Sequence, residues 1–275
     1  MKAANFRYQK PASVEDALRI LDSEGPKARL IAGGQSLGPM LNLRILQPPV
    51  LVDISAIPEL RRVSADGADL VLGACVTHAD IEDDRVVAGR GGVLARIAAG
   101  IAYRAVRNRG TIGGSLCYAD PAADWVTTLP ALSAMAVIRG LRGQRILPVE
   151  AFLTGALTTA LAVGEMLVAV RVPKQPPLAL FGYAKNCRKV GEFSKASAAI
   201  LVEPDAMTGR VALGALDGAP RVVGAKDLLT KNKDATVGVN APAATAALIA
   251  AGVADPVRRH IHAAVLVRAT LEMAA

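Results

Sequence analysis

Two pairs of adjacent glycines, each followed closely by a hydroxyl side chain, are the residues of this chain best suited to binding chemistry. One pair lies in Ala32-Gly33-Gly34-Gln35-Ser36 and the other in Thr111-Ile112-Gly113-Gly114-Ser115. Adjacent glycines admit positive φ and let backbone N–H groups converge on an anion, and a hydroxyl beside them can bond a phosphate oxygen. Two such loops could hold the two phosphates of one dinucleotide, although each loop alone is also compatible with an ordinary turn.

Neither glycine segment matches a standard nucleotide-binding motif. The sequence has no G-x-G-x-x-G opening a βαβ unit and no G-x-x-x-x-G-K-[ST], which argues against a Rossmann NAD site and a P-loop NTPase. It also has no H-E-x-x-H zinc motif. The pattern therefore does not predict a zinc metalloprotease.

The histidines and the acidic residues do not form a catalytic or metal-binding group in the sequence. His260 and His262 are two residues apart on an expected helix, so they do not share a face. We expect both of them, and His78, to lie at the surface or at helix ends. The acidic run at residues 80–84 is typical of a solvated helix face.

The cysteines are Cys75, Cys117 and Cys187, and none of them forms a C-x-x-C pair. An iron–sulfur cluster normally takes four thiolates, so this chain alone is one short. Scattered, unpaired cysteines are typical of a reducing cytosol. Any redox chemistry would therefore have to be carried by a bound organic cofactor.

The composition indicates a soluble globular protein of one large or two medium domains. The sequence has 275 residues, of which 52% are apolar and 20% are charged. The net charge of +8 comes without a basic run or an aromatic platform, which argues against nucleic-acid binding. No segment approaches 18 uninterrupted apolar residues and the N-terminus lacks an apolar signal core. We therefore expect no membrane span and a cytoplasmic protein.

Hydrophobic periodicity predicts the elements that must position the glycine segments, which are themselves expected to be loops. Helices are predicted over 13–23, 93–106, 124–135, 241–250 and 256–273, and strands over 50–54, 69–75, 136–139, 166–172, 195–202 and 209–216. A proline-rich break at residues 173–177 interrupts both helix and strand and predicts a domain boundary.

The residues that flank the glycine segments carry a more specific signal than the glycine pairs alone. Four segments resemble, in order, the FAD-binding medium subunit of the molybdenum hydroxylases: residues 31–44 with 51–54, residues 107–124, residues 188–193 and residues 257–268. That family includes carbon monoxide dehydrogenase and the bacterial xanthine and nicotine dehydrogenases. The resemblance covers nearly the whole chain.

The resemblance implies an α+β fold. Residues 1–175 would form a FAD-binding domain of the vanillyl-alcohol-oxidase (PCMH) type, with two subdomains at about 1–55 and 56–175. Residues 176–275 would form a small α+β C-terminal domain like that of the carbon monoxide dehydrogenase flavoprotein.

The resemblance also implies the cofactor site, with no catalytic residue and no metal ligand in this chain. The two glycine segments would grip the FAD pyrophosphate through Ala32, Gly33, Gly34, Gln35, Ser36, Thr111, Ile112, Gly113, Gly114 and Ser115. Asp124 would meet the ribityl or isoalloxazine side, and Lys185 would approach the flavin or the adenosine half. Phe193 would lie near the flavin ring, where related subunits often have Tyr or Trp. Cys187 stands where several relatives carry a basic residue, and we expect it to be a small apolar filler.

The resemblance finally implies a function and partners. The chain would be the FAD-carrying electron-transfer subunit of a heterotrimeric molybdenum hydroxylase. It would take electrons from two [2Fe–2S] clusters of a small subunit, beside a large molybdopterin subunit, in a dimer of heterotrimers. A free-standing flavin oxidase and a non-catalytic nucleotide-binding assembly subunit are the alternatives. The substrate stays open between carbon monoxide, purines, nicotine-like N-heterocycles and aldehydes, because its site would lie in another chain.

Overall fold

The computed structural model describes residues 2–83, 92–234 and 236–273. It divides into two compact units, each made of discontinuous segments. The first unit comprises Met1–Tyr118, Met135–Leu147 and Thr159–Val172, and the second comprises Ala119–Ala134, Pro148–Thr158 and Pro173–Ala275. The domain boundary expected after residue 175 and the subdomain boundary near residue 55 stay predictions.

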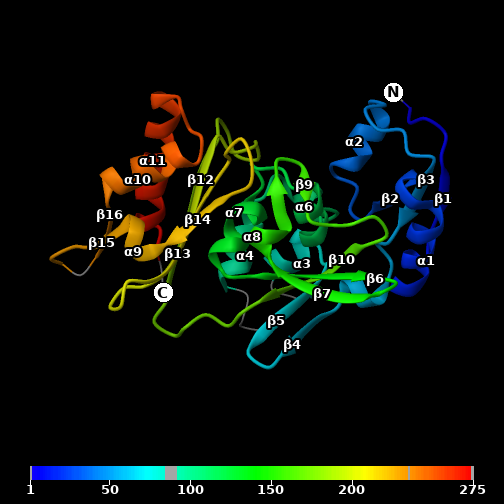
Figure 1. The fold of residues 1–275 in the computed structure, drawn as a ribbon, viewed down its shortest axis with the longest axis horizontal. Helices are drawn as coiled ribbons and strands as arrows, with labels where there is room; N and C mark the ends of the chain where they lie inside the picture. Colours follow the sequence, from blue (N-terminus) through cyan, green and yellow to red (C-terminus); the bar gives the residue numbers. More distant parts are fainter. Residues whose placement is uncertain (1, 84–91, 235, 274–275) are drawn as a thin grey trace. The chain divides into compact units, whose positions relative to one another are not determined.

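The first unit begins with a small parallel sheet covered by one helix (Figure 1). Its strands are β1 (Arg7–Gln9), β2 (Ala28–Ile31) and β3 (Val50–Asp53), in the order β1-β3-β2. Helix α1 (Val14–Glu24) begins where the Ser13 side chain accepts a hydrogen bond from the Asp16 N–H, and its apolar face is buried. The carboxyl ends of parallel strands lie at one edge, so the first glycine segment, which follows β2, shares that edge with Asp53.

A five-stranded sheet forms the rest of the first unit. It consists of β4 (Val63–Asp66), β5 (Asp69–Gly73), β10 (Met166–Val172), β6 (Met135–Gly140) and β7 (Gly143–Pro148), in that spatial order. The short helices are α2 (Leu37–Asn42), α3 (His78–Glu82), α4 (Gly92–Ala99), α5 (Arg104–Arg107) and α6 (Ile112–Tyr118), with 3-10 turns at Gly25–Lys27 and Pro58–Arg61.

Two of the sequence predictions for this unit are wrong. The single helix expected over 93–106 is divided into α4 and α5, because Ala102 adopts a φ of 42° and a right-handed helix cannot pass through it. The second glycine segment, expected as a loop, forms the first turn of α6 from Ile112 onward.

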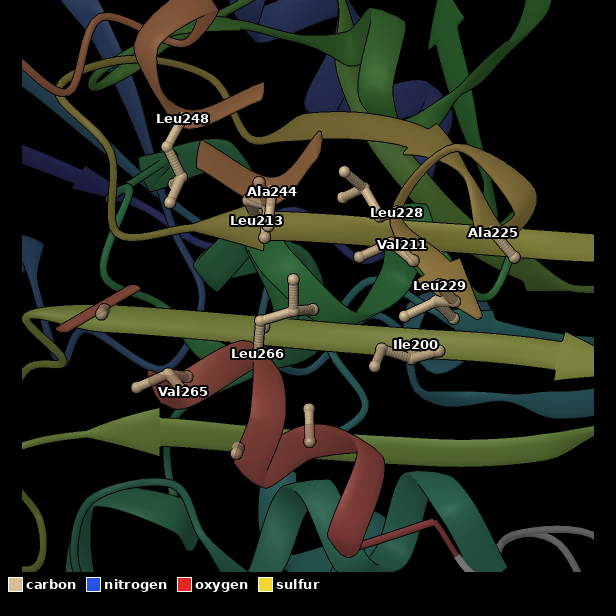
Figure 2. Close-up of a cluster of buried hydrophobic side chains, with 14 of the residues drawn as sticks. Ile200, Val211, Leu213, Ala225, Leu228, Leu229, Ala244, Leu248, Val265 and Leu266 are labelled. Atoms are coloured by element: carbon tan, nitrogen blue, oxygen red, sulfur yellow. The ribbon is translucent and has the colours of Figure 1, made fainter. Parts of the chain in front are cut away.

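The second unit is an antiparallel sheet with helices on both faces. Its strands are β11 (Leu180–Asn186), β12 (Ala196–Glu203), β13 (Thr208–Gly214) and β14 (Arg221–Gly224). Helix α11 (Pro256–Leu271) packs on β11 and β12, with α10 (Ala241–Ala250) beside it, while α7 (Asp124–Ala131) packs against β12 and β13. Figure 2 shows the apolar cluster between the sheet and α10 and α11, built around Ile200, Leu213 and Leu266. Since both faces are covered, every residue of β12 before Glu203 is buried.

The remaining elements of the second unit are short. They are α8 (Val149–Phe152), β8 (Leu153–Gly155), α9 (Ala225–Leu228), β15 (Leu229–Lys231) and β16 (Val237–Val239), and β9 (Thr158–Thr159) pairs with β8. Among the described residues of both units, no helix has the length and apolar character needed to cross a bilayer.

Candidate functional site

The first glycine segment is a turn that leaves its backbone donors free. Gly34 has a φ of 72°, a conformation that favours glycine. The segment's carbonyl groups are used, since Gly34 accepts from the Gly38 N–H at 2.8 Å and Gly33 from the Gln35 side-chain amide at 3.2 Å. None of the N–H groups of residues 32–36 has a protein acceptor in the described part of the chain. Consecutive free N–H groups of this kind form a concavity suited to an anion.

The two glycine segments lie against each other. A Cβ atom built at Gly33 would overlap the carbonyl group of Arg109, two residues before the second segment. Only the absence of a side chain at Gly33 permits this approach. The structure therefore brings the two sequence-predicted segments together, as one dinucleotide would require.

The second glycine segment uses its backbone donors within the protein. The Ile112 N–H donates to the Val76 carbonyl at 3.1 Å, and the Gly113 N–H to the Ala74 carbonyl at 3.0 Å. The other two N–H groups bond Thr111: that of Gly114 donates to its hydroxyl and that of Ser115 to its carbonyl, both at 3.0 Å. Gly113 packs so closely on Ala74 that a Cβ atom could not fit. What the segment can offer a ligand is its side chains, above all the Ser115 hydroxyl, which has no partner among the described residues.

A buried histidine supports the turn before the second segment, and sequence reasoning missed it. The His78 N–H donates to the Gly110 carbonyl at 2.9 Å, and the His78 ring lies where a Cβ atom at Gly110 would be. Burial lowers the pKa of His78 to about 4, and the charge of Arg107 adds to that effect. His78 lies at a helix end, as one of the two expected alternatives has it, since it begins α3. Its side chain is nevertheless buried, because it faces the turn at Gly110.

His262 is also buried instead of exposed, on the face of α11 that meets the sheet. Neither of its ring nitrogens has a hydrogen-bond partner among the described residues, and burial lowers the pKa of His262. The prediction of a surface or helix-end position is therefore wrong for His262, because the face of a helix cannot be assigned from a spacing of two residues.

The acidic side chains of the run at residues 80–84 are half-buried to exposed where the structure describes them, and their carboxylates are engaged in contacts within the protein. Asp80 forms a capping box with Thr77 at the start of α3. Glu82 pairs with Arg107 at 2.7 Å, and the hydrogen bond from Arg107 lowers the pKa of Glu82. These contacts fasten α3 to α5, which leads into the second glycine segment. Asp84 lies outside the described residues.

In the second unit, Asp124 and Lys185 meet as a part-buried pair, together with a tyrosine that sequence reasoning missed. The Lys185 Nζ lies 2.6 Å from Asp124 Oδ1, and the Tyr183 hydroxyl donates to the same oxygen at 2.8 Å. Burial and the Asp124 carboxylate raise the pKa of Tyr183 well above 10, so the hydroxyl keeps its proton. Asp124 Oδ2 has no hydrogen-bond partner in the part of the chain that the structure describes. A ligand donor could therefore bind there.

The strand pattern carried a signal for Tyr183. Alternate residues of a strand share a face, and Tyr183 stands two positions before Lys185 on β11. The other sequence-predicted residues of this unit lie in the connection between β11 and β12. Phe193 is 72% exposed there, and Cys187 is a free, half-buried thiol. Their expected roles stay predictions.

Comparison with known proteins places the chain in a family. Residues 4–175 match the family model described as the FAD binding domain in molybdopterin dehydrogenase. The chain is 35% identical to the nicotine 6-hydroxylase medium subunit of Paenarthrobacter nicotinovorans over 83% of its length and 81% of that protein. It is 37% identical to the carbon monoxide dehydrogenase medium chain of Hydrogenophaga pseudoflava, over 74% of its length and 71% of that chain.

Solved structures extend the likeness over the whole chain. The carbon monoxide dehydrogenase of Hydrogenophaga pseudoflava aligns with a TM-score of 0.87 at 33% identity, covering 99% of this chain and 98% of that one. Quinoline 2-oxidoreductase from Pseudomonas putida 86 aligns with a TM-score of 0.81 at 31% identity, covering 98% and 97%. The fold class expected from the resemblance is confirmed. The chain therefore belongs to the FAD-binding medium subunits of the molybdopterin dehydrogenases, a family of oxidoreductases.

Proposed function

We propose that this chain carries FAD as the electron-transfer subunit of a heterotrimeric molybdenum hydroxylase. In this proposal a small partner subunit delivers electrons from two [2Fe–2S] clusters, and a large partner subunit holds molybdopterin and the substrate. The relatives named medium subunit and medium chain support this division of labour. The observation that carries the proposal is the row of free N–H groups in the first glycine segment.

The residues present fit the cofactor. A diphosphate offers acceptor oxygens to the free N–H groups of residues 32–36, and the Ser115 hydroxyl can add a further donor. Asp124 Oδ2 can accept from a ribityl hydroxyl or a ring N–H, while Lys185 balances the charge of that carboxylate. When bound, FAD supplies the electron transfer that none of these side chains performs.

The residues of this chain would bind and orient the cofactor. The Tyr183 hydroxyl and the Lys185 ammonium both approach Oδ1, which fixes the rotation of the Asp124 carboxylate and leaves Oδ2 for the ligand. Phe193, exposed in the described chain, could cover an apolar ring surface. On this basis we propose that Lys185 and Phe193 lie beside the bound cofactor.

A flavin-depleted complex tests the proposal. The complex is purified with its partners, stripped of FAD and mixed with its reducing substrate in a stopped-flow spectrometer. We expect the cluster absorbance to bleach while reduction of the external acceptor stalls, and FAD to restore acceptor reduction. Full turnover without FAD, or turnover by this chain alone, would contradict the electron-transfer role and favour a free-standing oxidase.

Partners and location need separate measurements. We propose a dimer of heterotrimers in the cytoplasm. Pull-down of the tagged chain from its own cells should recover the large and small subunits, and light scattering should give twice the mass of one trimer. Recovery of the chain without either subunit would contradict the assembly.

A further inference from the structure

We propose that Arg109, assisted by Lys10, supplies the positive charge that balances the diphosphate of a dinucleotide bound at the first glycine segment. The inference rests on the proposed FAD binding and assigns the ionic partners of that site, which backbone donors alone do not provide.

Charge balance sets the requirement. The diphosphate of FAD carries two negative charges, whereas the N–H groups of residues 32–36 carry dipoles and no net charge. Removing an anion from water is costly unless an opposite charge accompanies the hydrogen bonds. A site of this kind therefore needs cationic side chains at the edge where the segment lies.

Arg109 is at that edge. Its carbonyl group packs on Gly33, so Arg109, two residues before the second glycine segment, lies directly against the first segment. The charge of Arg109 also acts on the Tyr8 hydroxyl, which donates to Asp53 at the end of β3. The charge of Arg109 thus acts at the carboxyl edge of the small parallel sheet, where the first glycine segment begins.

Lys10 approaches the same edge from the other side. It follows β1, and its charge contributes to lowering the pKa of Asp53. Asp53 already accepts from the Tyr8 hydroxyl and from the Ser55 N–H. The one carboxylate that we identify at this edge is therefore occupied by neutral donors and forms no ion pair with either cation.

Both cations lack an ion-pair partner among the described residues, whereas several other arginines of the first unit have one. Ion pairs occupy Arg7, Arg19, Arg104, Arg107, Arg139, Arg145 and Arg171. Neither Arg109 nor Lys10 forms an ion pair or a side-chain hydrogen bond with any described residue, and both are exposed. A guanidinium left free beside a row of N–H donors can take a phosphate in two parallel hydrogen bonds.

The test compares Arg109→Gln with Arg62→Gln. Arg62 is also exposed and belongs to the same unit, so its replacement removes one positive charge that lies outside both glycine segments in the sequence. FAD affinity is measured by flavin fluorescence between low and high salt, with riboflavin as a probe that has the ring and the ribityl chain but no phosphate. We expect Arg109→Gln to weaken FAD binding about tenfold at low salt and to flatten its salt dependence. Riboflavin binding and the Arg62→Gln variant should stay at wild-type values.

Lys10→Gln should weaken FAD binding about threefold, because lysine acts as a point charge without the guanidinium fork. An Arg109→Gln protein that binds FAD as tightly as wild type would overturn the inference. An equal loss for riboflavin would also overturn it, because the effect would then not depend on phosphate. A wild-type chain that binds no FAD would overturn the proposed function and this inference with it.

Discussion

The two glycine segments look alike in sequence and differ in what they offer a ligand. In the first, the N–H groups of residues 32–36 are free, whereas in the second the N–H groups of residues 112–115 are all used within the protein. The first segment follows an edge strand of a parallel sheet and turns away from it. The second begins a helix, with Thr111 as its cap. A pair of glycines before a hydroxyl therefore predicts close backbone approach, but it does not predict free donors.

The glycines themselves are required for different reasons. Gly34 is required for its positive φ, Gly113 because Ala74 leaves no room, and Gly33 because the Arg109 carbonyl occupies that space. The first segment thus combines a conformational and a steric requirement, and the steric one joins the two segments. Substitutions can separate these requirements.

The largest effect is expected for Gly33→Ala, because the new Cβ would overlap a backbone carbonyl that cannot move without separating the segments. We expect the free energy of unfolding to fall by about 3 kcal/mol. The fraction of the purified protein that retains flavin should fall to about a tenth or lower. The measurements are thermal unfolding and the flavin absorbance of the purified chain near about 450 nm. Gly38→Ala is the matched control, since it lies in α2 with open space around it and should change neither quantity. Full flavin content in Gly33→Ala would contradict the contact between the segments.

Acid should destabilise the turn before the second glycine segment, because His78 packs against that turn. The pKa of His78 is about 4 in the folded chain and 6.5 ordinarily, so the unfolded chain binds the proton more tightly. The free energy of unfolding should therefore fall as the pH falls from 6.5 to 4, by up to about 3 kcal/mol. His78→Asn should remove that part of the pH dependence, as followed by denaturant unfolding across this range. His260→Asn, at an exposed histidine, should leave it in place. An unchanged pH profile in His78→Asn would mean that another group accounts for the acid sensitivity.

Gly34→Ala should lower the free energy of unfolding by about 1 kcal/mol, because alanine is strained at the positive φ of this position. FAD affinity should fall about thirtyfold, since relaxing the strain re-aims the free N–H groups. Gly67→Ala is the control, because Gly67 also has a positive φ with open space around it, in the turn between β4 and β5. It should lose similar stability and no affinity. Equal affinities for the two variants would contradict the assignment of the first segment as the donor row.

The sequence predicted the elements with strong local periodicity and missed those that depend on tertiary contacts. Helices at 241–250 and 256–273 and the strand at 166–172 were expected and are present as α10, α11 and β10. Strand β11 was missed, because Gly182 interrupts its apolar pattern. That glycine is required by the Ala269 carbonyl of α11, which packs against it.

The same limit applies to the site. Local pattern was sufficient to find both glycine pairs, and the family resemblance added Asp124 and Lys185, which the structure pairs at 2.6 Å. It could not show that Ala74 and Val76, more than thirty residues earlier, accept the N–H groups of the second segment. Such acceptors are backbone carbonyls, which carry no residue type for a sequence pattern to report.

The smallest effects should separate the two hydroxyls of the second segment. Thr111 is buried and its oxygen accepts from the Gly114 N–H, so Thr111→Ala removes a helix cap and should cost about 1 kcal/mol of stability. Ser115 has no partner among the described residues, so Ser115→Ala should leave stability unchanged and weaken FAD binding about tenfold, as expected for a lost hydrogen bond to phosphate. Thermal unfolding without FAD and fluorescence titration with FAD measure the two quantities separately. If Ser115→Ala lowered the melting temperature and left affinity intact, the second segment would serve only as a support for the first.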